Sequence, residues 1–233
     1  GPGALSRTYR PQDIRFHVGK MVQDRGAHFI QDKVVRVDGE GCTLHLASEA
    51  LVNYDVVSFN SGSGIALGRG EDDDRIIPVK PIINLLKGQK RILQESARHP
   101  LKLLVLGGGP AGVEIAGNLW ALRENIGKKG DITLVAGSRL LKNMPSRVRE
   151  LAYAILRRRG IEILEGVHAS KVSDGEALLS DGHRVGFDFA FAATGVTPSP
   201  LFKDSGLPTG PDGGLLVNSF LQSPAYPEMF GGG

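Results

Sequence analysis

The chain has 233 residues, of which 41% are hydrophobic and 23% are charged, and its formal net charge is +3. This composition is typical of a globular protein with a buried core, and the mild positive charge gives no indication of nucleic-acid binding. The single cysteine, Cys42, excludes a disulfide or a CxxC redox pair within the chain, so a reducing, cytoplasmic location is expected.

The first part of the chain predicts a helix, a strand, an antiparallel meander and a second strand. We expect the first strand over residues 25–30, the meander from residue 34, and a largely apolar strand over residues 54–59 that ends at a turn containing Gly62. Cys42 is expected in a meander strand, with a structural role.

Two segments lead from this part to the next strand. The acidic run Glu71-Asp72-Asp73-Asp74 predicts a solvated turn rather than a metal site. Residues 78–99 predict a connector that carries a helix.

A glycine-rich turn follows an apolar strand predicted over residues 101–106, and a helix is predicted over residues 110–123. In a nucleotide-binding βαβ unit, the first glycine allows a tight turn, the second lets the pyrophosphate approach the backbone, and the third lets the helix pack closely on the strand. A second strand predicted over residues 131–135 completes that context, which favours a dinucleotide site over a merely structural turn. The turn residues assigned to the site are Gly107, Gly108, Gly109, Pro110, Ala111 and Gly112.

The start of the helix adds Val113 and Glu114 to the predicted site. We place Glu114 in the first turn, where its carboxylate has two interpretations. It is either a partner of the helix dipole or a contact for the carboxamide or ribose of a nicotinamide cofactor.

The end of the second strand bears on the choice between NADH and NADPH. An NAD-selective unit carries Asp or Glu there, whereas this chain has Ala136. The following Gly137, Ser138 and Arg139 offer a hydroxyl and a guanidinium that would receive a 2′-phosphate. The pattern therefore favours NADPH, and the alternative is that Arg139 is simply exposed to solvent.

The next part of the chain repeats the elements of the first. An amphipathic helix over residues 147–159, whose three terminal arginines are expected to be solvated, is followed by a strand, a meander over residues 170–185 and an apolar strand over residues 187–194. Three pairs of residues recur at offsets of 134, 133 and 133 residues: Gly26 with Gly160, Asp55 with Asp188, and Gly62 with Gly195. The chain therefore contains an internal repeat. Because a match to Gly107 in the first copy would precede residue 1, we expect the chain to be truncated at its start.

Other classes of site lack support. No run approaches the ~18 consecutive apolar residues of a membrane-spanning helix, and the first part of the chain lacks the apolar region of a signal peptide. The 6 histidines show neither HxH nor HExxH spacing, so no metal site is predicted. Any membrane contact is expected to be peripheral.

Three segments together resemble the pyridine nucleotide-disulfide oxidoreductase superfamily: GGGPAGVEIAGNL at residues 107–119, YDVVSFNSGSG at residues 54–64 and FAFAATGVTPSPLF at residues 189–202. The resemblance covers almost the whole chain. In that superfamily an NAD(P)H-binding domain is inserted into a FAD-binding domain of the same ancestry, which agrees with the repeat. The glycine-rich turn, in the second copy, would then bind the nicotinamide cofactor.

The resemblance implies further cofactor contacts. Residues 188–195 would flank the NAD(P)H site, residues 212–217 would return to the FAD domain, and the tail over residues 227–233 resembles the FAxGD motif without its aspartate. Because the FAD fingerprint is missing as well, we expect the chain not to retain FAD. The residues assigned on this basis are Ala193, Thr194 and Gly195 on the NAD(P)H side and Ser61, Gly62 and Ser63 on the FAD side.

The lack of a redox cysteine pair makes the chain similar to the cysteine-free branch, such as type II NADH dehydrogenases. In that branch NAD(P)H reduces FAD by hydride transfer, and reduced FAD passes electrons to a quinone or another acceptor, while the protein supplies positioning. The resemblance implies an enzyme in the full-length protein, cytoplasmic or membrane-associated. It implies no catalytic side chain, and we expect the fragment alone to be inactive.

The expected fold class is α/β: a Rossmann-like three-layer NAD(P)-binding domain with an antiparallel β-meander, inserted in a partial FAD domain of the same fold. We expect a partial FAD domain over residues 1–75, a connector helix over 76–99, the NAD(P)H domain over 100–200 and the return to the FAD domain over 201–233. Two alternatives remain: a non-catalytic dinucleotide-binding module of a larger protein, and an interaction fragment with a decayed site, which only Ala136 supports.

Overall fold

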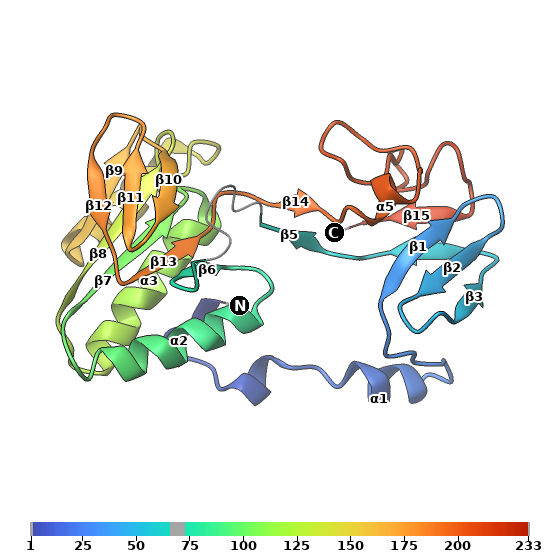
Figure 1. Ribbon diagram of the computed structural model, residues 1–233, viewed down its shortest axis with the longest axis horizontal. Coiled ribbons are helices and arrows are strands. Elements are labelled where there is room, and N and C mark those ends of the chain that lie inside the picture. Colours follow the sequence, from blue (N-terminus) through green and yellow to red (C-terminus); the bar gives the residue numbers. More distant parts are fainter. Residues whose placement is uncertain (1, 66–72, 233) are drawn as a thin grey trace. The chain divides into compact units, whose positions relative to one another are not determined.

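The computed structural model describes residues 2–65 and 73–232. They form two compact units (Figure 1). Unit 1 comprises Gly1–Arg15 and Ile65–Val196, and unit 2 comprises Phe16–Gly64 and Thr197–Gly233. No helix in the described residues is both long and apolar enough to span a bilayer.

Unit 1 is built on a parallel five-stranded sheet with an antiparallel meander on one face and helices on the other (Figure 1). In spatial order, the sheet consists of β6 (Ile76–Pro78), β13 (Phe189–Ala192), β7 (Leu101–Leu106), β8 (Gly130–Ala136) and β9 (Ile161–Glu165). The helices are α2 (Ile83–Glu95), α3 (Pro110–Asn125) and α4 (Ser146–Arg158), and the meander consists of β10 (Ala169–Ser173), β11 (Glu176–Leu179) and β12 (Arg184–Gly186).

Strand β7 shows why its sequence is almost continuously apolar. Successive side chains of a strand point to opposite faces, and β7 is covered on both. Leu103 and Val105 belong to the core that includes the helices, whereas Leu104 and Leu106 belong to the core that includes the meander. The predicted three-layer α/β fold is therefore confirmed.

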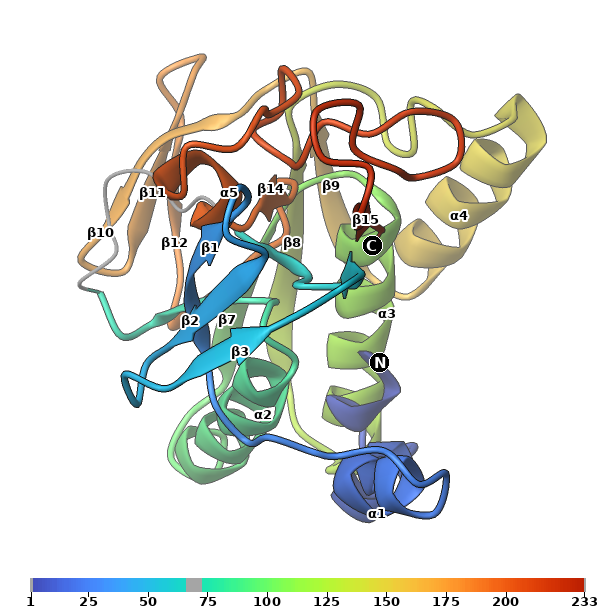
Figure 2. The ribbon, with the colours of Figure 1, turned by 90° about the vertical axis from the view of Figure 1, so that its right-hand side faces the viewer.

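Both ends of the expected connector are integrated into unit 1. β6 pairs with β13 at one edge of the sheet, and Leu85 and Ile92 of α2 lie in the helix-side core. The start of the chain packs here too: the short helix η1 (Pro2–Ala4) contacts α3 (Figure 2), and Leu5 is fully buried. The structure thus groups the first residues and α2 with the nucleotide-binding fold.

The acidic run is only partly described, because Glu71 and Asp72 lie outside the described residues. The expectation of a solvated turn is wrong for Asp73, whose side chain is 10% exposed and pairs with Arg75 at 2.8 Å. Hydrogen bonding to the Arg75 guanidinium lowers the pKa of Asp73. This pair holds the turn that leads into β6.

We predict that Asp73→Asn lowers the free energy of unfolding of unit 1 near pH 7. Because the Arg75 side chain is 37% exposed and the pair is screened by solvent, the expected loss is about 1 kcal/mol. The pKa of Asp73 is lowered in the folded state, so its contribution is complete above the unfolded pKa of about 4 and disappears as pH falls through the lowered value. Urea unfolding at several pH values measures this.

The control for this prediction is Asp131→Asn, which changes an exposed carboxylate at the start of β8. It should leave the free energy of unfolding unchanged. If the difference in free energy of unfolding between wild type and Asp73→Asn stayed constant down to pH 3, it would contradict the assigned ion pair.

Unit 2 has a small mixed framework. Its core consists of Val37, Phe59, Phe202, Leu207 and Met229, with the rings of Phe59 and Phe202 edge to face at 5.2 Å. β1, β2 and β3 form an antiparallel sheet (Figure 2), β4 pairs with β15 in parallel, and β5 pairs with β14. The bounds are α1 (Val18–Gln23), β1 (Val34–Asp38), β2 (Thr43–Leu46), β3 (Leu51–Asn53), β4 (Val57–Phe59), β5 (Ser63–Gly64), β14 (Thr197–Pro198), α5 (Leu201–Asp204) and β15 (Met229–Gly231); η2 (Pro11–Ile14) belongs to unit 1.

The two copies of the repeat share a helix, a left-handed glycine, a meander and a final parallel strand. Gly26 and Gly160 follow α1 and α4 with φ of 72° and 73°. The predicted strand over residues 25–30 is wrong, however, because this segment is irregular and Ile30 is 58% exposed. A strand needs a neighbour for its backbone groups. β9 has β8, whereas no described strand lies beside residues 27–33.

Three local expectations also need correction. Cys42 lies in the turn before β2, with φ of 46°, rather than in a strand. β4 begins only at Val57, and Val56 is 65% exposed. At the end of α4, Arg157 and Arg158 are exposed as expected, whereas the Arg159 guanidinium stacks over the Trp120 ring at 4.2 Å.

Candidate functional site

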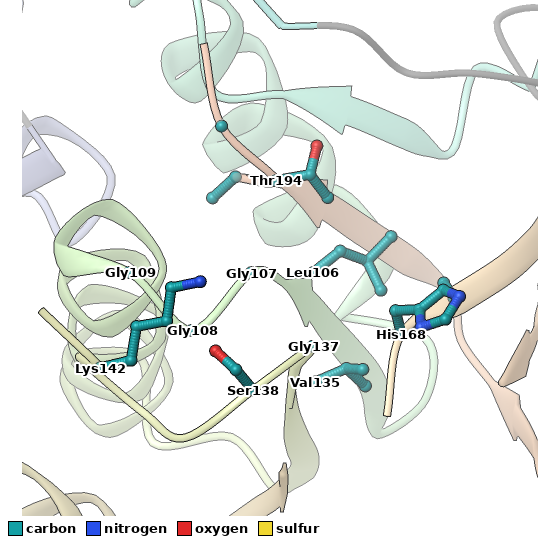
Figure 3. Close-up of a pocket in the computed structure, with 13 residues that line it drawn as sticks. Leu106, Gly107, Gly108, Gly109, Val135, Gly137, Ser138, Lys142, His168 and Thr194 are labelled. Atoms are coloured by element: carbon teal, nitrogen blue, oxygen red, sulfur yellow. The ribbon is translucent and has the colours of Figure 1, made fainter. Parts of the chain in front are cut away.

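A pocket of about 430 Å³ lies at the carboxyl ends of β7, β8 and β13 in unit 1 (Figure 3). Ligands of open α/β sheets bind at this edge, and the volume falls in the range of small-molecule sites. The lining residues are Leu106, Gly107, Gly108, Gly109, Val135, Gly137, Ser138, Lys142, His168, Ala169, Ala193, Thr194 and Gly195.

The chain turns sharply where β7 ends at Gly107. Gly107 has φ of 123°, and a Cβ there would lie 2.2 Å from the carbonyl oxygen of Ala193 on the neighbouring strand. Its backbone N–H donates to the carbonyl of Val135 at 2.8 Å. The turn therefore passes between the ends of β8 and β13, where only glycine fits.

Helix α3 starts directly against this turn. A Cβ on Gly112 would lie 1.8 Å from the carbonyl oxygen of Gly107, so the third glycine sets the close approach of helix and turn. Gly109 is the N-terminal cap of α3 and lines the pocket. The free N–H groups and positive dipole end of a helix favour an anion such as a pyrophosphate.

Residues 137–142 form a second wall that is tied to the glycine turn. The N–H of Leu141 donates to the Gly108 carbonyl at 2.7 Å, and the N–H of Leu140 donates to Oε1 of Glu165 at 2.5 Å. Both leucine side chains are buried. This segment therefore holds Ser138 and Lys142 at the pocket.

Strand β13 supplies the third wall and is anchored at both ends. The N–H of Ala193 donates to the Leu106 carbonyl at 2.7 Å. At the other end, Asp188 donates its N–H to the Lys102 carbonyl at 2.8 Å, and its carboxylate accepts from the Lys102 N–H at 2.7 Å. These bonds bring Thr194 and Gly195 opposite the glycine turn.

The predicted site residues separate into three groups in the structure. Eight line the pocket of unit 1: Gly107, Gly108, Gly109, Gly137, Ser138, Ala193, Thr194 and Gly195. Six lie in the same unit but outside its lining: Pro110, Ala111, Gly112, Val113, Glu114 and Arg139. Ser61, Gly62 and Ser63 belong to unit 2. Binding of a cofactor by any of them remains a prediction.

Val113 and Glu114 line a different depression, between α3 and α4. Because α3 begins at Pro110, Glu114 lies in the second turn of the helix rather than the first, and its side chain is exposed. Arg139 is exposed outside the pocket lining.

In unit 2, Ser61 and Gly62 line a depression of about 170 Å³ beside Phe59, Phe202 and Asp212. Ser63 follows in β5, which pairs with β14. The segment 212–217, expected to return to the FAD domain, contributes Asp212 to this depression, and β15 of the tail pairs with β4.

Sequence reasoning missed two polar residues of the pocket of unit 1, Lys142 and His168. Lys142 lies six residues beyond the strand end, and His168 follows the next strand, so no short motif joins them to the glycines. Their side chains lie on different walls of the pocket (Figure 3). A signal was available for His168 in its position after a parallel strand, since such strand ends converge at one edge.

The charge of this pocket is one-sided. None of its lining residues is Asp or Glu, whereas Lys142 carries a positive charge. No cluster of potential metal ligands occurs among residues 2–65 and 73–232. The groups that this lining offers, glycine backbone and a lysine ammonium, suit an anionic ligand.

The model of the pyridine nucleotide-disulphide oxidoreductase family matches residues 82–233. The chain belongs to this family. The superfamily resemblance found in the sequence is thereby confirmed.

Individual curated relatives match the chain to different extents. The internal alternative NAD(P)H-ubiquinone oxidoreductase A1, mitochondrial, of Arabidopsis thaliana is 26% identical over 65% of this chain and 31% of its own length. Ferroptosis suppressor protein 1 of Taeniopygia guttata is 28% identical over 88% of this chain and 56% of its own length. The chain thus matches between 31% and 56% of the length of these relatives.

A solved structure supports the fold over nearly the whole chain. The ferredoxin reductase for the CYP199A2 system from Rhodopseudomonas palustris superposes with a TM-score of 0.83 over 98% of this chain and 57% of its own, at 21% identity. The chain therefore shares the fold of this reductase over nearly its whole length.

Proposed function

We propose that unit 1 binds NADH or NADPH and that, in the full-length protein, the bound cofactor passes a hydride to FAD, which passes electrons to a quinone or another acceptor. The glycine turn at the start of α3, which places backbone N–H groups at the pocket, carries this proposal. A relative of this chain is named an NAD(P)H-ubiquinone oxidoreductase, which supports the same chemistry and acceptor class.

The residues of the pocket fit a nicotinamide dinucleotide. Gly107, Gly108 and Gly109 would hold the pyrophosphate, since they leave their backbone accessible, and Thr194 and Gly195 would border the nicotinamide end. When bound, the nicotinamide supplies the hydride and the flavin accepts it. The side chains of the chain contribute orientation and exclusion of water rather than proton transfer.

The FAD contacts are proposed for unit 2. Ser61 and Gly62 follow β4, the counterpart of β13 in the repeat, and line the depression of unit 2, and Ser63 lies in β5. We also propose that this chain alone does not retain FAD. A cytoplasmic location with peripheral membrane contact of the full-length protein belongs to the same proposal.

Calorimetric titration of the 233-residue chain with NADH, NADPH and FAD tests the binding step. We expect one nicotinamide dinucleotide to bind with 1:1 stoichiometry, and we expect FAD not to displace it. Failure of both NADH and NADPH to bind would overturn the proposal. Displacement of the bound nicotinamide dinucleotide by FAD would show that the glycine turn binds FAD instead.

A second candidate function is a binding module without turnover. The visible spectrum and the NAD(P)H oxidation rate of the full-length protein decide between the two. Flavin absorption together with quinone-dependent NAD(P)H oxidation supports the enzyme. A full-length protein that binds the nucleotide but holds no flavin and transfers no electrons supports the module.

A further inference from the structure

We propose that Lys142 makes unit 1 selective for NADPH by binding the 2′-phosphate of its adenosine ribose. The inference rests on the proposed function and goes beyond it by naming the phosphorylated dinucleotide and the residue that selects it. The juxtaposition that carries it is Lys142 beside Ser138 in a pocket whose lining has no carboxylate.

The Lys142 side chain extends into the pocket along the same wall as Ser138 and ends near the glycine turn (Figure 3). Among the residues that the structure describes, its ammonium has no hydrogen-bond or ion-pair partner. An ammonium group without an internal partner, directed into a cavity, is suited to bind an anionic ligand, and lysine binds phosphate as a point charge.

The backbone that carries Lys142 is fixed before any ligand binds. Leu140 and Leu141 are 1% and 6% exposed, and their N–H groups bond to Glu165 and to the Gly108 carbonyl. Leu141 also has φ of 52°, in the left-handed region. Because its neighbours are held in this way, Lys142 loses less conformational freedom on binding than a lysine in a free loop would.

A ribose 2′-hydroxyl would find no carboxylate in this lining. Ala136, at the position where NAD-selective units carry an acid, is 1% exposed. Its partner across the strands is Glu165, whose carboxylate accepts the Leu140 N–H and does not line the pocket. A 2′-phosphate, in contrast, would find the ammonium of Lys142 and the hydroxyl of Ser138.

Arg139 provides a matched control. It lies three residues before Lys142 in the same segment and is also a long, exposed cation. Both residues are exposed, but only Lys142 belongs to the pocket lining. The sequence pattern favours Arg139 as the phosphate ligand, whereas the structure points to Lys142. The two assignments predict opposite results for the two substitutions.

The test is calorimetric titration of the 233-residue chain and of its Lys142→Met and Arg139→Met variants with NADPH and NADH. We expect wild type to bind NADPH more tightly than NADH. Lys142→Met should weaken the binding of NADPH by roughly 10-fold, which corresponds to the lower end of the free energy of a hydrogen bond to a charged group. It should weaken the binding of NADH by less than about 2-fold. Arg139→Met should leave the affinities for NADPH and NADH unchanged. Circular dichroism should show that both variants are folded.

Titration with adenosine 2′,5′-bisphosphate and with AMP separates the 2′-phosphate from the other phosphates. Lys142→Met should weaken the binding of the bisphosphate and leave the binding of AMP unchanged. Equal weakening of NADPH and NADH would assign Lys142 to the pyrophosphate and overturn the inference, as would no effect of Lys142→Met or a loss with Arg139→Met. Tighter binding of NADH by wild type overturns the inference alone, whereas absence of binding of either dinucleotide overturns the proposed function as well.

Discussion

Gly112→Ala should lower the free energy of unfolding of unit 1 by about 3 kcal/mol or more, which is the upper end of the usual cost of adding atoms to a packed region. The added Cβ would lie 1.8 Å from the backbone oxygen of Gly107, and neither backbone can move without disturbing the turn or α3. Urea unfolding followed through Trp120, the single tryptophan, measures the change in unit 1, because this residue lies in α3.

The matched control is Gly109→Ala in the same turn. Gly109 has φ of −79°, and a Cβ there has no atom within 4 Å, so the free energy of unfolding should remain within about 0.5 kcal/mol of wild type. The new methyl group would instead occupy the pocket where the pyrophosphate is proposed to lie. Nicotinamide nucleotide binding should therefore weaken roughly 10-fold or more.

This pair of variants separates a structural turn from a binding turn. If Gly109→Ala kept full nucleotide affinity, the glycine turn would serve only the packing of α3 on β7. If Gly112→Ala were as stable as wild type, the close contact between helix and turn would be wrong.

Phe191→Ala should lower the free energy of unfolding of unit 1 by about 3–5 kcal/mol, the usual cost of truncating a buried phenylalanine. Phe191 is fully buried in β13, in the core that also contains Ile77 and Leu85. A Cβ on Gly88 of α2 would lie 3.2 Å from its ring, so α2 packs directly on this side chain. Urea unfolding followed by Trp120 fluorescence gives the measurement.

Phe220→Ala is the control, because Phe220 is 80% exposed. It should change the free energy of unfolding by no more than about 0.5 kcal/mol. A small effect of Phe191→Ala would mean that α2 does not depend on β13 for its packing, in conflict with its place in the core of unit 1.

The nucleotide-binding βαβ unit could be predicted closely from its residues. β7 was expected over residues 101–106 and α3 from residue 110, and both begin there. The signals for these elements are local, since an apolar run, a glycine turn and an amphipathic or buried helix each act within a few residues. The meander and β13 could likewise be located from the repeat together with the apolar run that follows Asp188.

The elements that depended on a distant neighbour were harder to predict. Residues 27–33 have the apolar character of a strand but no described strand beside them, whereas β6 forms because β13 lies next to it. A nearby partner was missed as well: the acidic character of Asp73 suggested solvent, but Arg75, two residues away, pairs with it. In each case the partner decided the outcome.

By itself the sequence of this protein determined the family, the three-layer fold class and the glycine turn, because each of them is indicated by residue types at short or regular spacing. Only the tertiary structure decided which side chains line the pocket. Arg139 and Lys142 are both cations, yet only Lys142 lines the pocket, in a segment that is held by two buried leucines and by the hydrogen bonds of their backbone N–H groups. Side-chain direction in an irregular segment depends on such contacts, which residue order does not reveal.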